Sequence, residues 1–192
     1  MTPISCPTVQ TLDQILPDEP LLMMGAGPVP IPAPVAYANS LVINHLGPVM
    51  GKVLNQVKDM ARYVFQTNTP YILGVAGPGS ATMEMAMANL LEPGDRMLAV
   101  CNGYFSSRMA DMARRVGAEV TEHRVEGTQC ADPQTVLQQV RALQPKVITL
   151  VQGETSNTVW NRYLPEIARG ASELGCLVVV DAVCTLSTMP LN

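Results

Sequence analysis

From Tyr71 to the end of this 192-residue chain, short apolar segments alternate with longer amphipathic ones. Short apolar runs predict strands, and apolar residues at three- and four-residue steps predict helices. The predicted strands are Tyr71 to Ala76, Arg96 to Cys101, Glu119 to Val125, Lys146 to Val151 and Cys176 to Val180; the predicted helices are Ser80 to Leu91, Phe105 to Val116, Pro133 to Leu143 and Pro165 to Leu174. Because helices between strands make crossover connections, the sequence predicts an α/β fold with a mostly parallel sheet.

The residues before Tyr71 lack this alternation. Residues 1–20 show no sustained period and are predicted to form an amino-terminal arm, with residues 21–192 as one domain. The stretch from Gly25 to Pro34 carries four prolines, and since proline removes an amide donor and fixes φ, it predicts turns. After Pro48, apolar residues recur at helical spacing as far as Phe65, which predicts one long amphipathic helix.

Charge and composition exclude several classes of function. The formal net charge is −4, whereas general binding to nucleic acid or acidic membranes needs clustered Lys and Arg. No apolar run reaches the roughly 18 residues that span a bilayer. Asp13, Asp18 and Glu19 stand where a signal peptide would have a basic start and an apolar core. We therefore expect a cytoplasmic protein that binds neither nucleic acid nor membranes.

The cysteines and histidines do not suggest a metal site. The five cysteines form no CxxC pair, and only two histidines are present, so we predict no metal. Cys101 and Cys176 lie in apolar runs, where free cysteine behaves as a small buried hydrophobe. Cys184 follows Asp181 closely and is expected in the core, behind a site or lining one.

Asp181 ends the apolar run that begins at Leu177. Open α/β sheets bind ligands at the carboxyl ends of their strands, so Asp181 stands where a ligand would lie. Asp after a strand also commonly caps the next turn. Both interpretations of Asp181 stay open on this segment alone.

The junction from Gly77 to Thr82 lies between a predicted strand and a predicted helix. Its glycines allow close approach of the backbone, and its amides begin a helix, which is typical of a phosphate-binding turn. Such a turn also occurs for steric reasons alone. A dinucleotide fingerprint is disfavoured, because the third glycine is missing and the next strand ends without an acidic residue.

In their order and spacing, the motifs resemble the amino-terminal half of class V aminotransferases of the alanine–glyoxylate and serine–pyruvate type, from about Leu21 onward. The motifs that carry the resemblance are Gly25-Ala26-Gly27-Pro28, His45-Leu46-Gly47-Pro48, Tyr63-Val64-Phe65-Gln66-Thr67, the glycine-rich loop before Met83-Glu84, Asn89-Leu90-Leu91-Glu92-Pro93-Gly94-Asp95, Asn102-Gly103, Gly153-Glu154-Thr155-Ser156 and Val180-Asp181-Ala182-Val183. The resemblance implies the large domain of a three-layer, fold-type I pyridoxal phosphate enzyme, incomplete at its carboxyl end.

The resemblance also implies a role for each matching residue. Pro78, Gly79 and Ser80 would bind the cofactor phosphate. Phe105 and Val183 would pack on the two faces of the pyridine ring, Thr155 would bond to its 3-hydroxyl side, and Asp181 would pair with its protonated nitrogen. The substrate mouth would be lined by Gly25, Ala26 and Gly27.

Two departures from the family pattern concern the chemistry. Pro78 stands where the family usually has a hydroxyl side chain. The Schiff-base lysine is absent, since the only lysines are Lys52, Lys58 and Lys146 and none stands in the Ser/Thr-x-Lys position, which would lie shortly beyond Asn192. We therefore expect a truncated, inactive portion of a transaminase.

The resemblance implies that the whole protein transfers an amino group from alanine or serine to a 2-oxo acid such as glyoxylate or pyruvate, as a homodimer. One alternative is another fold-type I lyase, although such relatives typically stack a histidine where this chain has Phe105. The other is a non-catalytic remnant that binds the cofactor or a partner.

Overall fold

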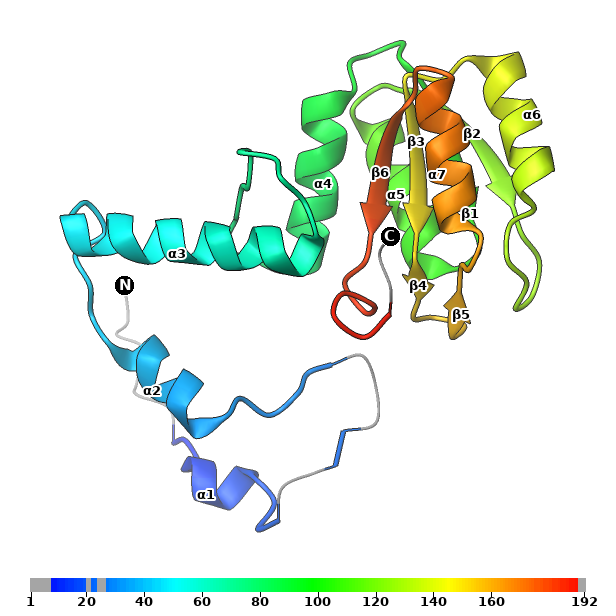
Figure 1. Ribbon diagram of the computed structural model, residues 1–192. Helices are drawn as coiled ribbons and strands as arrows, with labels where there is room; N and C mark the ends of the chain where they lie inside the picture. Colours follow the sequence, from blue (N-terminus) through cyan, green and yellow to red (C-terminus); the bar gives the residue numbers. More distant parts are fainter. Residues whose placement is uncertain (1–7, 20–21, 24–26, 190–192) are drawn as a thin grey trace, which may run out of the picture. The chain divides into compact units, whose positions relative to one another are not determined.

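The computed structural model describes residues 8–19, 22–23 and 27–189. The chain divides into two compact units, Met1–Val42 and Ile43–Asn192, which are described separately (Figure 1). The described part of the first unit contains α1 (Leu12–Ile15) and α2 (Ala33–Ser40). Residues 27–32 form neither helix nor strand, as their prolines predict. Pro34 lies in the first turn of α2, where its missing N–H costs no helical hydrogen bond.

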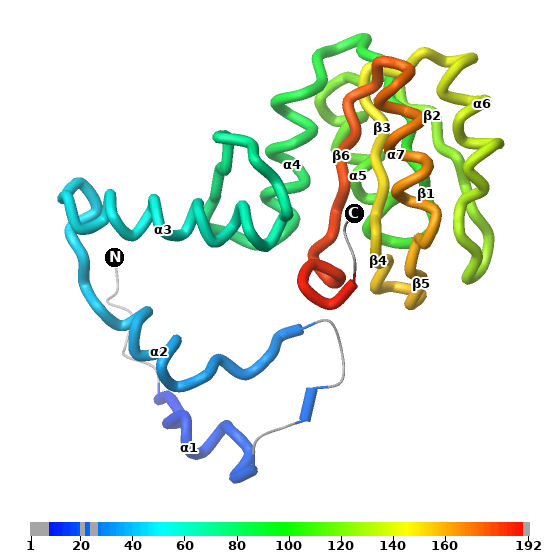
Figure 2. Tube along the Cα trace, in the orientation of Figure 1, coloured from blue at the N-terminus to red at the C-terminus, as the bar shows by residue number. Residues whose placement is uncertain are grey.

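A four-stranded sheet with the spatial order β2-β1-β3-β6 forms the centre of the second unit (Figures 1 and 2). The strands are β1 (Arg96–Cys101), β2 (Glu119–Arg124), β3 (Val147–Val151) and β6 (Leu177–Asp181). Each neighbouring pair is parallel, so the predicted α/β fold with a parallel sheet is confirmed. The helices of this unit are α3 (Pro48–Phe65), α4 (Gly79–Leu90), α5 (Tyr104–Arg115), α6 (Pro133–Leu143) and α7 (Leu164–Glu173).

Successive residues of the central strands pack on opposite faces of the sheet. Met97 of β1 contributes to a core with α4 and α5, whereas Leu98 contributes to a second core with α6 and α7. In β3, Val147 and Ile148 divide between the same two cores. Because both faces are covered, β1 and β3 are nearly continuous apolar runs, as is usual for strands of a covered parallel sheet.

The strand β6 forms one edge of the described sheet. Its apolar sequence suggests a strand buried on both faces, but Leu177 is 48% exposed and Val180 is 36% exposed. This exposure accompanies an edge position, since β3 lies along one side of β6 and no described strand lies along the other.

The predicted strand at Tyr71 to Ala76 is wrong. These residues form no regular element, and Tyr71 and Leu73 are more than 80% exposed. Their residue types favour a strand, but a strand also needs a neighbour to pair its backbone N–H and C=O groups. None of the described strands is a partner of this segment.

Two local features complete this unit. A small antiparallel hairpin of β4 (Gly153–Glu154) and β5 (Val159–Trp160) follows β3 and was not predicted from the sequence. The predicted long helix is present as α3, none of whose residues is buried. Within the described ranges, neither α3 nor any other helix combines the length and apolar character needed to cross a membrane.

Candidate functional site

The parallel register brings the carboxyl ends of the strands to one edge of the sheet. Asp181 at the end of β6 pairs with Val151 at the end of β3. Asn102 and Gly103 follow the end of β1 and lead directly into α5. Gly153 begins β4 two residues after the end of β3. The segments predicted to bind a ligand therefore start from the same edge, which is where open parallel sheets place their ligand sites.

The predicted phosphate-binding turn lies at the beginning of α4. Pro78 is the N-cap residue, Gly79 is the first helical residue, and no side chain from the described residues caps this end. A Cβ atom built on Gly79 would lie 3.9 Å from a methyl carbon of Val183. The start of α4 and the turn after β6 are therefore neighbours, although Gly79 and Val183 are far apart in the sequence.

Asp181 is half-buried, and its carboxylate has one defined partner. The backbone N–H of Val183 donates a 3.0 Å hydrogen bond to Asp181 Oδ1. The turn-cap interpretation of Asp181 is therefore confirmed. The structure assigns no partner to Asp181 Oδ2 within the described residues, and a carboxylate has acceptor sites for further donors.

Thr155 contacts the turn that follows Asp181. Its Oγ1 lies 2.7 Å from Cys184 Sγ, a hydrogen bond in which either group can donate. A Cβ atom on Gly153 would lie 2.5 Å from a methyl carbon of Thr185, so only glycine allows this close approach. Cys184 is half-buried behind Thr155, whereas Cys101 and Cys176 are buried as predicted.

Phe105 lies in the first turn of α5 and is half-buried. Its ring makes an edge contact with Tyr104, with centroids 5.2 Å apart and planes at 87°. The backbone N–H of Phe105 donates a 3.2 Å hydrogen bond to Glu154 Oε1. Glu154 immediately precedes Thr155, so Phe105 and Thr155 are connected through one side chain.

Glu154 is completely buried, and the sequence reasoning gave it no role. Its Oε1 accepts from Phe105 N–H and, at 2.7 Å, from the Ser156 hydroxyl. Its Oε2 accepts from the N–H and the hydroxyl of Ser106, both at 2.9 Å. Ser156 Oγ in turn accepts from Tyr104 N–H at 2.9 Å. The sequence shows an ionisable residue shortly after an apolar strand, but it does not show which groups donate hydrogen bonds to that residue.

The hydrogen bonds keep Glu154 ionised. Burial on its own would raise the pKa of this carboxyl group. Donation from Ser106 N–H, the Ser156 hydroxyl and Phe105 N–H outweighs burial, and the pKa of Glu154 lies below its usual value. Glu154 is therefore a filled hydrogen-bond acceptor and is not available as a proton donor.

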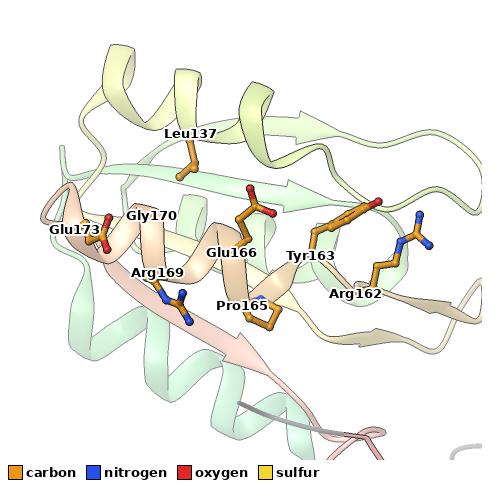
Figure 3. Close-up of a pocket in the computed structure, with 8 residues that line it drawn as sticks. All are labelled: Leu137, Arg162, Tyr163, Pro165, Glu166, Arg169, Gly170 and Glu173. Carbon is orange, nitrogen blue, oxygen red and sulfur yellow. The ribbon is translucent and has the colours of Figure 1, made fainter.

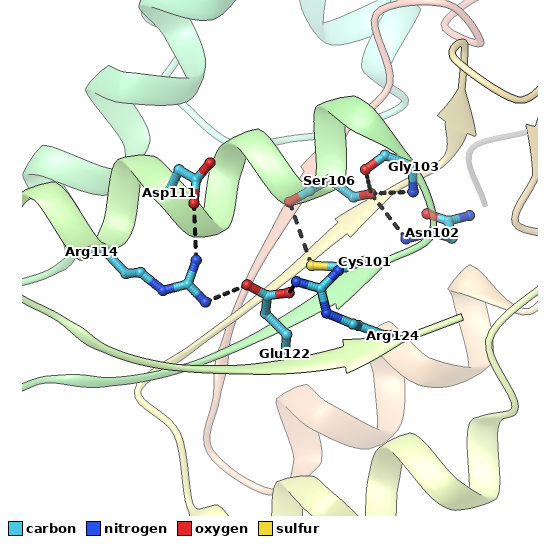
Figure 4. Close-up of polar contacts among 8 residues, drawn as sticks. All are labelled: Cys101, Asn102, Gly103, Ser106, Asp111, Arg114, Glu122 and Arg124. Carbon is cyan, nitrogen blue, oxygen red and sulfur yellow. Dashed lines mark hydrogen bonds and ion pairs between the residues drawn. The ribbon is translucent and has the colours of Figure 1, made fainter. Parts of the chain in front are cut away.

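The loop between β1 and α5 is shaped around the Glu154 carboxylate. The hydroxyl of Ser106 accepts hydrogen bonds of 3.0 Å from the N–H groups of Asn102 and Gly103 (Figure 4). A Cβ atom on Gly103 would lie 2.5 Å from Glu154 Cδ and 2.5 Å from Ser156 Oγ. Close by, burial and then the Glu122 charge raise the pKa of Cys101 to about 11, so this thiol is neutral at pH 7.

A separate hollow of about 570 Å³ lies over α7 and α6 (Figure 3). Its lining includes Arg162, Glu166, Arg169 and Glu173, which carry both signs of charge, and Leu137 from α6. It contains none of the residues predicted to bind a cofactor. We interpret this hollow as a solvated helix surface.

The substrate mouth was predicted at Gly25, Ala26 and Gly27. Gly27 belongs to the first unit, and Gly25 and Ala26 lie outside the described residues. The roles of these three residues stay predictions. The structure brings together Gly79 with Val183, Thr155 with Cys184, and Phe105 with Glu154.

The close approach at Gly103 leads to a testable prediction. Gly103→Ala should lower the free energy of unfolding by about 1–3 kcal/mol, because the added methyl group forces Glu154 and Ser156 away. The control is Gly51→Ala in α3, where a Cβ atom meets nothing within 4 Å. Chemical denaturation of both variants measures the effect. Equal stability of Gly103→Ala and the wild type would contradict the observed contact.

The lowered pKa of Glu154 predicts an acid-sensitive contribution to stability. This contribution is fully present above the unfolded-state pKa, about 4.3, and is lost as the pH falls through the lower folded-state pKa. The difference in unfolding free energy between wild type and Glu154→Gln should therefore be largest at neutral pH and decrease on acidification. Denaturation at a series of pH values tests this. A difference that stays constant to pH 3 would mean that Glu154 is not ionised in the native state.

Comparison with known proteins gives a consistent assignment. The family model for class-V aminotransferases matches residues 36–192. Mouse (Mus musculus) alanine–glyoxylate aminotransferase is 33% identical over 186 residues, which cover 96% of this chain and 45% of that protein. The (S)-ureidoglycine–glyoxylate transaminase of Bacillus subtilis is 28% identical, covering 85% of this chain and 39% of that protein.

Solved structures agree with the sequence relatives. The crystal structure of ureidoglycine-glyoxylate aminotransferase from Bacillus subtilis matches with a TM-score of 0.85 and 26% identity, covering 92% of this chain and 46% of that chain. Alanine–glyoxylate aminotransferase from Nostoc sp. matches with a TM-score of 0.79 and 31% identity, covering 95% and 50% respectively. This chain thus spans about half the length of its relatives, and it belongs to the class-V aminotransferase family.

Proposed function

We propose that this chain forms the cofactor-binding part of a pyridoxal phosphate-dependent transaminase. The whole protein would move an amino group between a small amino acid, alanine or serine, and a 2-oxo acid such as glyoxylate or pyruvate. One observation carries the proposal: the segments that leave one edge of the parallel sheet contact one another. Gly79 lies beside Val183, Thr155 bonds to Cys184, and Phe105 bonds to Glu154. Relatives named for glyoxylate support the choice of amino acceptor.

The start of α4 fits a phosphate group. This helix has 12 residues and no side-chain cap from the described residues, so the first-turn N–H groups point toward a site where an anion is favoured. Gly79 is exposed and Ser80 is half-buried, with its hydroxyl as a further donor. Pro78 contributes no N–H group, and we propose that the backbone of Gly79 and Ser80 carries most of the binding.

The residues near the other segments fit an aromatic ring with polar edges. Phe105 offers a ring for stacking, and Val183, which is 76% exposed, offers an apolar contact on the other face. If the Cys184 thiol donates to Thr155 Oγ1, the Thr155 hydroxyl remains able to donate to the oxygen on the cofactor ring.

Asp181 would hold the ring nitrogen in its protonated form. Since Val183 N–H occupies Oδ1, the remaining oxygen can accept a charge-assisted hydrogen bond from the pyridinium N–H. The cofactor supplies an electron-withdrawing ring that stabilises negative charge at the substrate α-carbon. Asp181 maintains that property by keeping the positive charge on the ring.

None of the three lysines fits the covalent role. Lys146 directly precedes β3, whereas Asp181 ends β6, so the parallel strands hold them at opposite ends of the sheet. Lys146 also forms an ion pair with Asp95. Lys52 and Lys58 lie on α3. We therefore propose that this 192-residue chain binds the cofactor without a covalent bond and without turnover.

Two further properties are proposed on the grounds of the family resemblance and the sequence. We propose a homodimer for the whole protein, which acts on small amino and 2-oxo acids. The location proposed is the cytoplasm. Neither nucleic acid nor a membrane surface is a proposed partner, because the net charge is −4 and basic clusters are lacking in the sequence.

Asp181→Asn tests the proposed cofactor site. The asparagine keeps an oxygen for Val183 N–H but loses the negative charge, so the affinity for pyridoxal phosphate should fall about tenfold, as expected for a charge-assisted hydrogen bond. Absorbance titration measures the dissociation constant, and Asp111→Asn on exposed α5 surface is the matched control. Unchanged affinity in Asp181→Asn would remove Asp181 from the site. A wild-type chain that does not bind the cofactor would overturn the proposed function.

The covalent state is tested separately by mass. Borohydride treatment of the chain with pyridoxal phosphate should give no stoichiometric pyridoxyl adduct at any single lysine, because none of the three lysines stands in the Ser/Thr-x-Lys position. Intact-mass analysis followed by peptide mapping provides the measurement. A full equivalent of adduct confined to Lys52, Lys58 or Lys146 would refute the proposal and identify a covalent site.

A further inference from the structure

Glu154 joins two segments that carry proposed ring contacts. It accepts a hydrogen bond from Phe105 N–H and lies directly before Thr155 in the chain. The hydrogen bonds from α5 to Glu154 connect positions 48 and 49 residues apart. One buried side chain therefore fixes the spacing between the stacking residue and the ring-hydroxyl partner.

Both oxygens of this carboxylate accept hydrogen bonds. Phe105 N–H, the Ser156 hydroxyl and, at 3.4 Å, Ser156 N–H donate to Oε1, and the N–H and the hydroxyl of Ser106 donate to Oε2. The first N–H groups of a helix have no partner inside the helix. In α5 the N–H groups of Phe105 and Ser106 donate to Glu154, and the N–H group of Tyr104 donates to Ser156. The Ser156 hydroxyl in turn donates to Glu154. The position of the first turn, including Phe105, depends on this carboxylate.

The proposed phosphate site is connected to the structure in a different way. No hydrogen bond among the described residues joins Glu154 to α4. The contact between α4 and α5 is apolar packing that includes Met83, Met87 and Met109. Loss of hydrogen bonds at the first turn of α5 leaves this packing in place, so the turn at Gly79 keeps its geometry.

We propose that Glu154 is a positioning residue for the cofactor ring, which aligns Phe105 with Thr155 and leaves the phosphate contacts independent of it. This inference rests on the proposed function. Loss of the hydrogen bonds to Glu154 lowers the affinity for ligands that contain the ring and leaves the affinity for ligands that have only the phosphate group unchanged.

Glu154→Gln removes the negative charge and leaves the volume of the side chain almost unchanged. An amide keeps one oxygen but replaces the other by an NH₂ group, which then faces hydrogen-bond donors of α5 or Ser156. The first turn of α5 must move to relieve this contact, and Phe105 moves with it. Ser156→Ala is a milder second change. It removes the acceptor of Tyr104 N–H and the hydroxyl donor to Glu154 Oε1, but it leaves both bonds from Ser106 to Glu154.

The experiment compares two probes on the full 192-residue chain. Pyridoxamine 5′-phosphate contains the ring but no aldehyde, so it cannot react with surface lysines, and its binding is followed by fluorescence. Inorganic phosphate tests the start of α4 and is followed by ³¹P NMR. The variants are Glu154→Gln and Ser156→Ala, with Glu166→Gln on the exposed surface of α7 as a control for the change of charge.

Glu154→Gln should lose about tenfold in affinity for pyridoxamine 5′-phosphate, as for lost hydrogen bonds to a charged group, and keep its affinity for inorganic phosphate. Ser156→Ala should show a smaller loss with the same selectivity and decides the question if Glu154→Gln does not fold. Equal losses for both probes, or no loss, would overturn the positioning role and leave the proposed function standing. A wild-type chain that binds neither probe would overturn both.

Discussion

The parallel pairing of β1, β3 and β6 is the constraint from which the rest of the site follows. Parallel strands have all their carboxyl ends at one edge, and the register places Val151 beside Asp181. The loops that leave this edge therefore start close together, however far apart they are in the sequence. Burial of β1 and β3 between two apolar cores holds this register, because a shift by one residue would move each side chain to the opposite face.

Edge placement alone does not align side chains to the accuracy that ligand binding requires. In this chain we assign the alignment to Glu154, whose burial would be unfavourable without the hydrogen bonds that it accepts. The donors of these bonds include N–H groups that α5 cannot satisfy internally. The N–H groups of α5 therefore offset the cost of burying the carboxylate, and the carboxylate supplies the acceptors that these N–H groups lack within the helix. Because Gly103 has no Cβ atom, the loop before α5 can approach Glu154 closely.

The sequence predicts those parts of the fold that depend on local patterns. The bounds of β1 and the proline at the start of α6 agree with prediction, because strand and helix periods are visible within one segment. Tyr71 to Ala76 fails because a strand also requires a partner, which no local pattern encodes. The hairpin of β4 and β5 is too short to show a period. In the site, the motifs identify Gly79, Phe105 and Thr155, but the sequence contains no sign of which donors Glu154 meets.

At Asp181 the observed turn cap and the proposed ring contact do not exclude each other. A carboxylate has two oxygens, and the turn after β6 uses only Oδ1, through Val183 N–H. That bond orients the side chain at the end of β6, and Asp181 as a whole is half-buried there. The same bond draws the backbone of Val183 back toward Asp181, next to Gly79. The turn cap thus places Asp181, the proposed ring partner, and the apolar side chain of Val183 next to each other, so the proposed binding role would use the same turn as the structural one.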